Sequence, residues 1–163
     1  MTRIGIGYDS HRFQAGRPLV LGGVRIEHEL GLAGHSDADA VLHAVTDALL
    51  GSLALGDIGE HFPDRDGRWK DTGSGQFVAH AVSLVAARCY RVVNCDVTVI
   101  TECPRLKDHK LAMRRCIADL LQVALDDVSV KAKTNEAMGW IGRQEGLAAI
   151  AAVTVEAIRR DGP

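Results

Sequence analysis

The sequence is poor in the residues that several functional classes require. Aromatic residues make up only 4% of its 163 residues, whereas proteins that bind single-stranded nucleic acid need aromatic platforms for stacking. The formal net charge is −2, so no basic excess favours nucleic acid or an anionic membrane surface. Eighteen apolar residues never occur in one run, as a membrane-spanning helix would require. We therefore expect no nucleic-acid partner and no membrane partner.

Several catalytic motifs are missing as well. There is no Gly-x-Ser-x-Gly elbow, and the four cysteines form no C-x-x-C pair. Gly5-Ile6-Gly7 lacks the third glycine and the following helix of a dinucleotide fingerprint, and the loop after Lys133 lacks the Gly-Lys-Ser/Thr ending of a Walker loop. A strand-like pattern begins at Arg3, which leaves no room for a secretion signal. We expect reduced cysteines and a cytoplasmic protein.

What the sequence does contain is a mixture of strand and helix patterns. A chain of 163 residues with 47% hydrophobic residues favours a single domain, residues 1–163, with a sizeable core. The patterns predict strands over 3–9, 91–101 and 127–133, a hairpin over 19–26, and helices over 37–50, 74–88 and 106–124. Periodicity leaves residues 147–158 undecided between helix and strand. We expect an α/β fold, more closely an α+β two-layer sandwich with three helices on one sheet face and the other face suited to association.

The segment from His35 to Gly51 predicts a helix with both ends marked. Ser36 or Asp37 is expected to cap its start, and Gly51 to be the left-handed residue after its last turn. Apolar residues recur with helical spacing at Ala38, Val41, Leu42, Val45, Ala48 and Leu49. His43 lies away from this stripe. His35 stands just outside the helix start, where anions are favoured.

Asp9, His11 and His43 are the best candidates for a metal site. In an extended strand Asp9 and His11 share one face, and the helix that carries His43 could dock against that strand. One carboxylate and two imidazoles with a fourth position open are typical of catalytic zinc or a similar divalent metal. The alternative, three ordinary surface residues, is left open by spacing alone.

Loops carry further charged residues that suit phosphate and a second cation. The acids are Asp57, Asp64, Asp66 and Glu136, and the bases are Arg105, Lys131, Lys133 and Arg143. Magnesium is commonly held by one or two carboxylates together with phosphate oxygens. Each of these residues is equally well explained as a solvated charge, so the residues alone indicate only phosphate-compatible loops near an open metal site.

Many short motifs occur in order along nearly the whole chain. They are Gly7-Tyr8-Asp9-Ser10-His11-Arg12-Phe13, Leu21-Gly22-Gly23-Val24, Gly34-His35-Ser36-Asp37-Ala38-Asp39, Leu42-His43-Ala44, Asp47-Ala48-Leu49-Leu50-Gly51, Gly56-Asp57-Ile58-Gly59, His61-Phe62-Pro63-Asp64, Asn94-Cys95-Asp96-Val97-Thr98, Lys131-Ala132 and Gly142-Arg143-Gln144-Glu145-Gly146. In this combination the chain resembles the 2-C-methyl-D-erythritol 2,4-cyclodiphosphate synthase family. The resemblance implies a mixed four-stranded sheet with residues 147–158 largely strand. It also implies a homotrimer with active sites between subunits.

The resemblance implies a phosphorus–oxygen lyase of non-mevalonate isoprenoid biosynthesis. Its substrate is a cytidine diphosphate ester, 4-diphosphocytidyl-2-C-methyl-D-erythritol 2-phosphate. The 2-phosphate attacks the β-phosphorus, which closes the 2,4-cyclodiphosphate and releases CMP. Two alternatives stay open at this point: a non-catalytic trimeric module that binds nucleotides or isoprenoid diphosphates, and a zinc hydrolase of phosphoesters.

The resemblance also assigns roles to individual residues. Asp9, His11 and His43 match zinc ligands, with Asp9 and His11 also lining the substrate, and Glu136 matches a ligand of magnesium or manganese. His35 and Thr134 match the catalytic residues that steady the reacting phosphates. The residues that match the family's contacts to the methylerythritol phosphate are Ser36, Asp57, Ile58, Gly59, Phe62, Pro63, Asp64, Arg65 and Asp66. Thr101, Cys103, Pro104, Arg105, Lys107, Ala132 and Lys133 match the cytidine pocket, which in the family belongs to the neighbouring subunit, and Asn135 matches a further substrate contact.

Trp140 and Arg143 match positions near the substrate and the trimer axis, where a central cavity could hold an isoprenoid diphosphate. Four residues depart from the family pattern. Lys133 and Asn135 stand where threonine is common, Arg105 where lysine is common, and Trp140 where phenylalanine is common. These departures affect the phosphate and nucleotide contacts and leave the metal ligands unchanged.

Overall fold

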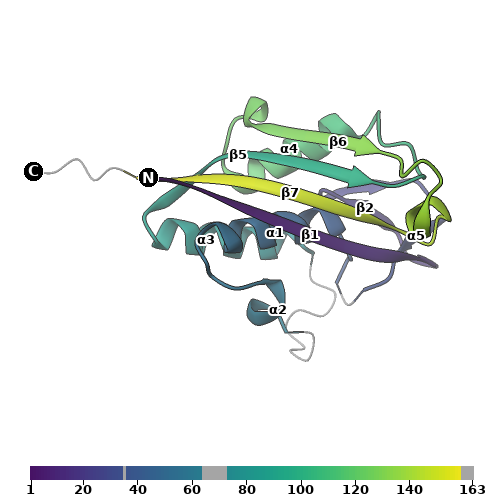
Figure 1. Ribbon diagram of the computed structural model, residues 1–163, viewed down its shortest axis with the longest axis horizontal. Helices are drawn as coiled ribbons and strands as arrows, with labels where there is room; N and C mark the ends of the chain where they lie inside the picture. The colour runs from purple at the N-terminus through teal and green to yellow at the C-terminus, as the bar shows by residue number, and fades with distance from the viewer. Residues whose placement is uncertain (35, 64–72, 159–163) are drawn as a thin grey trace, which may run out of the picture.

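A mixed sheet backed by helices forms the molecule (Figure 1). The structure is a computed structural model that describes residues 1–34, 36–63 and 73–158. The sheet order is β4-β1-β7-β5-β6, formed by β1 (Thr2–Ala15), β4 (Leu30–Leu32), β5 (Tyr90–Ile100), β6 (Val128–Lys133) and β7 (Gly146–Ala157). Strands β5 and β6 run parallel, and the other neighbours are antiparallel. A separate hairpin consists of β2 (Leu19–Leu21) and β3 (Val24–Ile26).

Three longer helices lie on one face of this sheet, as the sequence predicts. They are α1 (Ala40–Ser52), α3 (Gly75–Ala87) and α4 (Lys110–Leu121). Shorter elements are α2 (Ile58–His61), η2 (Leu125–Asp127) and α5 (Gly139–Gly142). Within the described part of the chain, none of the helices is both long and apolar enough to cross a bilayer. The α/β class, the helical layer and the hairpin are therefore confirmed.

Two strand assignments needed the structure or the family resemblance. Residues 147–158 are mostly strand β7, which has a neighbour on each side. Its helix-facing residues are fully buried, and such a central strand lacks the clear alternation that marks a half-exposed one. The fifth strand, β4, is new: only three residues long, it pairs with the end of β1 at Phe13↔Leu32. Three residues are too few to show a period-two pattern.

Strand β1 owes its position to two glycines on the side that faces α1. A Cβ atom at Gly5 would overlap the carbonyl oxygen of Ala48, and one at Gly7 would overlap that of Ala44. Both glycines are buried, whereas Ile4 and Ile6 on the opposite face are 67% and 71% exposed. Glycine therefore lets the helix backbone approach the strand backbone directly.

The boundaries of α1 differ from the predicted ones at both ends. Its N-cap is Asp39, not Ser36 or Asp37, and Ala38 lies before the helix with a φ of 55°. Asp39 accepts hydrogen bonds from the amides of Val41 and Leu42 in the helix, and also from the two glycines of the β2–β3 turn. The contact between Asp39 and the hairpin turn therefore determines where α1 begins.

Helix α1 continues through Gly51 to Ser52, so Gly51 is a helical residue and not the left-handed one. The third predicted helix, 106–124, is shorter than expected at both ends, because residues 107–109 form a turn before α4 and α4 ends at Leu121. The second, α3, is confirmed within one residue at each end, with Ser74 at its N-cap.

The contact between β1 and α1 can be tested with glycine substitutions. We expect Gly7→Ala to lower the free energy of unfolding by about 2–3 kcal/mol, because the added methyl group forces strand and helix apart. The matched control is Gly51→Ala, whose Cβ atom would lie 3.9 Å from the carbonyl oxygen of Ile6. It should be neutral or stabilising by up to about 1 kcal/mol. Urea denaturation of both variants checks this, and equal effects would contradict it.

Candidate metal centre

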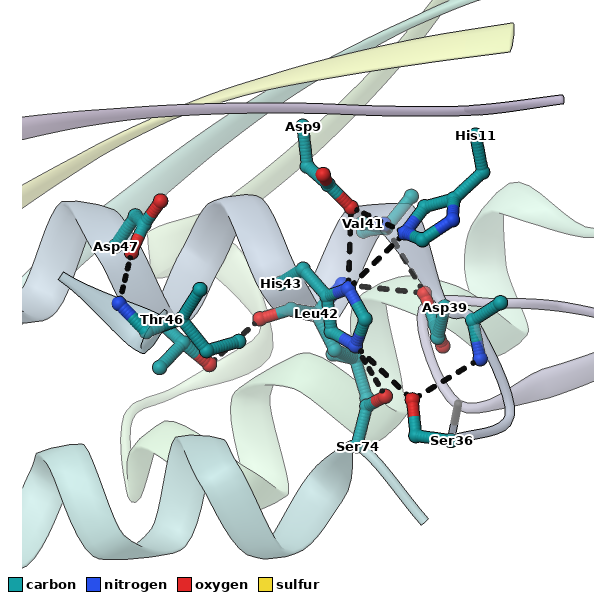
Figure 2. Close-up of polar contacts among 12 residues, drawn as sticks. Asp9, His11, Ser36, Asp39, Val41, Leu42, His43, Thr46, Asp47 and Ser74 are labelled. Atoms are coloured by element: carbon teal, nitrogen blue, oxygen red, sulfur yellow. Dashed lines mark hydrogen bonds and ion pairs between the residues drawn. The ribbon is translucent and has the colours of Figure 1, made fainter. Parts of the chain in front are cut away.

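Asp9, His11 and His43 converge where β1 crosses the first turns of α1 (Figure 2). Asp9 Oδ2 lies 2.9 Å from His11 Nε2 and 3.1 Å from His43 Nδ1. The two imidazole nitrogens are 3.3 Å apart. Strand alternation places Asp9 and His11 on the glycine face of β1, and His43 comes from the facing side of α1. These three atoms form a nearly equilateral triangle.

This triangle fits a tetrahedral divalent metal. Ligand atoms at roughly 2.0–2.1 Å from a tetrahedral zinc ion lie roughly 3.3 Å from one another. The observed separations of 2.9, 3.1 and 3.3 Å are close to that value. The side chains of Asp9, His11 and His43 are 25%, 18% and 13% exposed, so an incoming fourth ligand can reach them. The donor set therefore forms a candidate metal site with one position left for substrate or water.

The tautomer of His11 follows from its second nitrogen. His11 Nδ1 donates to the carbonyl oxygen of Ala33 at 2.6 Å, and a carbonyl can only accept. In the neutral ring the lone pair is then on Nε2, which is the nitrogen directed at Asp9 and His43. A backbone hydrogen bond of this kind commonly orients a metal-binding histidine.

The ring of His43 is held from its far side. Its Nε2 lies 2.9 Å from Ser74 Oγ and 3.3 Å from Ser36 Oγ (Figure 2). Asp39 and Asp47, four residues before and after it, have other partners: Asp39 caps α1, and Asp47 accepts from the amide of Ile58 at 2.8 Å. The two acids that flank His43 in sequence therefore accept hydrogen bonds from backbone amides.

Charge in the cluster is distributed between Asp9 and His11. Burial opposes ionisation of Asp9, but hydrogen bonds from His11 and His43 outweigh it and hold the pKa of Asp9 well below its ordinary value. Burial likewise disfavours protonated His11, but the hydrogen bond and charge of Asp9 raise the pKa of His11. Asp9 is thus an anion over the physiological range, as a metal ligand must be.

Residues expected to contact the methylerythritol phosphate lie beside this centre as far as the structure describes them. Ser36 is buried and adjacent to His43. Asp57 caps α2, Ile58 and Gly59 form its start, and Phe62 and Pro63 follow it. The rings of Phe62 and Phe77 are 4.5 Å apart, and Phe77 is 5.8 Å from the His43 ring. His35, Asp64, Arg65 and Asp66 lie outside the described residues.

The residues expected to form the cytidine pocket are brought together at one sheet edge. Strands β5 and β6 are parallel, so their carboxyl ends meet, with Ile100 paired to Lys133. The amide of Thr101 donates to the carbonyl oxygen of Lys133 at 2.9 Å. The loop after β5 contains Cys103, Pro104, Arg105 and Lys107, and that after β6 contains Thr134, Asn135 and Glu136, next to Ala132 and Lys133.

Side-chain hydrogen bonds connect the loops at this edge. The carboxylate of Glu102 accepts hydrogen bonds from the amides of Asn135 and Ala137 at 2.9 and 3.1 Å, which ties the two loops together. Sequence analysis missed Glu102, because its partners are 33 and 35 residues away. Thr134 Oγ1 donates to Glu136 Oε1 at 3.2 Å, and both side chains are exposed.

Trp140 lies on α5 and shares a shallow pocket with His11. This pocket has a volume of about 230 Å³ and is lined by Ser10, His11, Arg12, Trp140 and Glu145. Arg143 follows α5 and pairs with Glu145 at 2.6 Å. Trp140 therefore lies near the metal centre, while Arg143 is engaged by a neighbouring acid.

Asp37 and Ser74 have other roles than the sequence suggests. Asp37 was expected to cap α1 and Ser74 stands at the N-cap of α3, but neither side chain caps a helix. The hydroxyl group of Ser74 bonds to both Asp37 and His43, and Figure 2 shows its contact with the His43 ring. The only sequence signal was their polarity next to predicted helix starts.

Comparison with known proteins gives a consistent result. A family model described as the YgbB family matches residues 2–156. The 2-C-methyl-D-erythritol 2,4-cyclodiphosphate synthase of Xanthomonas axonopodis pv. citri is 57% identical over 93% of this chain and 91% of its own length. The bifunctional enzyme IspD/IspF of Erythrobacter litoralis is 53% identical over 99% of this chain, which spans only 42% of that enzyme.

Solved structures agree with the sequence comparison. A 2C-methyl-D-erythritol-2,4-cyclodiphosphate synthase in a CDP-bound form superposes with a TM-score of 0.88 at 38% identity. It covers 94% of this chain and 100% of its own. The bifunctional IspDF of Campylobacter jejuni reaches a TM-score of 0.92 at 40% identity, over 96% of this chain and 42% of its own. The chain therefore spans a whole monofunctional relative and about two fifths of the bifunctional ones.

The charge coupling in the metal centre can be measured in metal-free protein. We expect Asp9→Asn to lower the pKa of His11 towards its ordinary value, because the anion 2.9 Å from Nε2 is lost. The ion pair stabilises the fold fully below the ordinary histidine pKa and is lost as the pH rises through the raised one. The variant should therefore lose more stability at about pH 5 than at about pH 9.

An NMR titration of the His11 ring protons and urea denaturation at the two pH values check this prediction. Asp126→Asn is the control, since Asp126 is fully exposed. A pKa of His11 that stays raised in Asp9→Asn would contradict the assignment of its cause.

Proposed function

Since the chain belongs to the YgbB family, we propose that it catalyses the 2-C-methyl-D-erythritol 2,4-cyclodiphosphate synthase reaction. Its substrate is 4-diphosphocytidyl-2-C-methyl-D-erythritol 2-phosphate, and its products are the cyclic diphosphate and CMP. The reaction is that of a phosphorus–oxygen lyase in non-mevalonate isoprenoid biosynthesis. The observation that carries the proposal is the Asp9–His11–His43 triangle in a chain matched by the family over residues 2–156.

The reaction exchanges one phosphorus–oxygen bond for another within a single substrate. An oxygen of the 2-phosphate bonds to the β-phosphorus, and the bond from that phosphorus to the bridging oxygen breaks. The bridging oxygen leaves with CMP. Because nucleophile and electrophile belong to one molecule, holding them in line supplies much of the rate enhancement. Protein groups then have to position the phosphates and balance their charge.

Zinc at Asp9, His11 and His43, and magnesium or manganese at Glu136, are the proposed cofactors. When bound, these cations neutralise phosphate charge and polarise phosphorus–oxygen bonds. The nearly equilateral donor triangle supports zinc. The exposed carboxylate of Glu136, next to the exposed Thr134, is suited to the second cation and the diphosphate.

Side chains of two neighbouring copies of the chain orient the two ends of the substrate in the proposed assembly. We assign Thr134 and His35 to the reacting phosphates. The methylerythritol phosphate is assigned to Ser36, Asp57, Ile58, Gly59, Phe62 and Pro63 on the metal-centre side of the chain. Asp64, Arg65 and Asp66 are assigned to the same part of the substrate and lie outside the described residues. The cytidine lies in the joined loops after β5 and β6 of the neighbouring subunit, where Arg105, Lys107 and Lys133 offer positive charge and are exposed. Trp140 bounds the site beside His11.

A homotrimer with active sites between subunits is proposed as the working assembly. The sheet face opposite the helices exposes Ile4, Ile6, Tyr8 and Ile150 by 67%, 71%, 55% and 40%. A contiguous apolar face of this kind is typical of protein contact. Arg143 lies near the proposed axis, where an isoprenoid diphosphate is the proposed occupant of a central cavity. None of the four cysteines, all of them described, takes part in a disulfide bond, consistent with the proposed cytoplasmic location.

The reaction itself is tested by product analysis. Protein loaded with zinc and magnesium should convert the cytidine diphosphate ester to CMP and a cyclic diphosphate, which phosphorus NMR identifies. In water enriched in oxygen-18, a cyclase incorporates no solvent oxygen into either product, whereas a hydrolase incorporates one atom. Solvent label in the product, or ligand binding with no CMP released, would contradict the proposed reaction.

Removal of one metal ligand should abolish turnover. We expect His43→Ala to lower kcat by more than about 100-fold, because the donor triangle loses one corner. The control is His28→Ala, since His28 bonds to Leu30 and contacts Phe13 away from this centre. A steady-state CMP-release assay measures both. Turnover of His43→Ala at the wild-type rate would show that the triangle is not the catalytic metal site.

Glu136 should control the requirement for the second cation. We expect Glu136→Gln to raise the magnesium concentration for half-maximal rate about tenfold or more, because an amide is a weaker ligand than a carboxylate. Zinc content, measured by elemental analysis, should be unchanged. Glu27→Gln, at an exposed site after β3, is the control. An unchanged magnesium requirement would remove Glu136 from the proposed ligands.

A further inference from the structure

We propose that Asp37 and Ser74 act as positioning residues for the metal centre. They form a hydrogen-bond chain that fixes His43 in the tautomer whose Nδ1 carries the lone pair. This inference deepens the proposed function and rests on the zinc site proposed there. Neither residue belongs to the donor triangle, and both act through His43.

The direction of each hydrogen bond follows from the chemistry of the three groups. The carboxylate of Asp37 only accepts, so the Ser74 hydroxyl donates its single proton to Asp37 Oδ1. A lone pair of Ser74 Oγ then faces His43 Nε2 at 2.9 Å, and Nε2 must donate. A neutral imidazole that donates from Nε2 has its lone pair on Nδ1. That nitrogen is the corner of the donor triangle.

Asp9 favours the opposite tautomer. Its Oδ2 lies 3.1 Å from His43 Nδ1 and accepts a hydrogen bond from that nitrogen whenever it is protonated. A proton on Nδ1 would block metal binding, since a ligand nitrogen needs its lone pair. The Asp37–Ser74 chain competes with Asp9 for the ring's proton. Ser36 Oγ is a second neighbour of Nε2, at 3.3 Å, and also accepts from the amide of Ala38.

The burial of Ser74 and its unused capping position support this role. Ser74 is 0% exposed and stands at the N-cap of α3, yet its hydroxyl makes no bond to the amides of that helix. Asp37 also accepts from the amide of Ser74 at 3.0 Å, so one carboxylate holds both polar hydrogens of this residue. Figure 2 shows Ser74 below the His43 ring, opposite Asp9. The Ser74 hydroxyl therefore bonds to the His43 ring and does not cap α3.

The first test measures zinc affinity by competition with a chromophoric chelator. We expect Ser74→Ala to weaken zinc binding about 10–100-fold, as is typical for loss of a hydrogen-bond partner of a metal ligand. Asp37→Asn should also weaken zinc binding, because the NH2 group of asparagine replaces one of the two carboxylate oxygens that accept hydrogen bonds from Ser74. Ser74→Thr keeps the hydroxyl group and should restore affinity to within about tenfold of wild type.

The control is Ser83→Ala on the same helix, since Ser83 is exposed and its hydroxyl donates to the carbonyl oxygen of His80. It should bind zinc as the wild type does. Equal zinc affinity in wild type, Ser74→Ala and Asp37→Asn would overturn the proposal.

The second test needs no metal and separates this inference from the proposed function. Nitrogen-15 NMR of metal-free protein, recorded at alkaline pH so that the His43 ring carries a single proton, reports which ring nitrogen holds that proton. We expect protonated Nε2 for His43 in the wild type and in Ser74→Thr. In Ser74→Ala the proton should move towards Nδ1, where Asp9 accepts it.

An unchanged tautomer in a folded Ser74→Ala variant would overturn the inference even if zinc binds normally. Asp37→Asn gives the same readout if Ser74→Ala does not fold. Conversely, a wild type that binds no zinc but shows the expected tautomer shift would overturn the proposed cofactor and leave the hydrogen-bond chain supported.

Discussion

The rest of the structure depends on the direct contact between strand β1 and helix α1. Gly5 and Gly7 present no side chain to the helix, and the carbonyl oxygens of Ala48 and Ala44 occupy the space where Cβ atoms would lie. His43 precedes Ala44 by one residue, and Asp9 follows Gly7 by two. The approach that the glycines permit therefore brings an imidazole on the helix within 3.1 Å of a carboxylate on the strand. With a larger residue at Gly7, the donor triangle would open.

The alternation along β1 could be interpreted from sequence because its two faces differ strongly. Glycines and metal-ligand types share one face, and Ile4, Ile6 and Tyr8 share the other, so the pattern predicts both the strand and the shared face of Asp9 and His11. Convergence with His43 could not be derived in the same way. It requires α1 to dock at one position along β1. That position depends on contacts between the two backbones, and the sequence indicates those contacts only through Gly5 and Gly7.

The ends of the helices and the supporting hydrogen bonds show why other predictions differed. Three polar residues, Ser36, Asp37 and Asp39, were each suited to cap α1 by type. Asp39 is chosen because the amides of Gly22 and Gly23 also donate to it, and those come from a distant hairpin. Asp37 is thereby free to hold Ser74, 37 residues away. The preference of N-cap positions for short polar residues limits the choice to these three, and the contact with the hairpin determines that Asp39 is the N-cap.

Strand β7 separates the metal centre on β1 from the proposed nucleotide residues of the same chain, which lie at the carboxyl ends of β5 and β6. Strand β7 lies between β1 and β5, with Ala149 opposite both Asp9 and Val99. At about 4.8 Å per strand, β1 and β5 are roughly 10 Å apart. Leu147 and Ala149, both fully buried, fill the helix-facing space between them. The proposed nucleotide loops of the same chain are therefore set about two strand spacings to one side of the metal centre, and the proposed trimer would bring the loops of a neighbouring subunit to it.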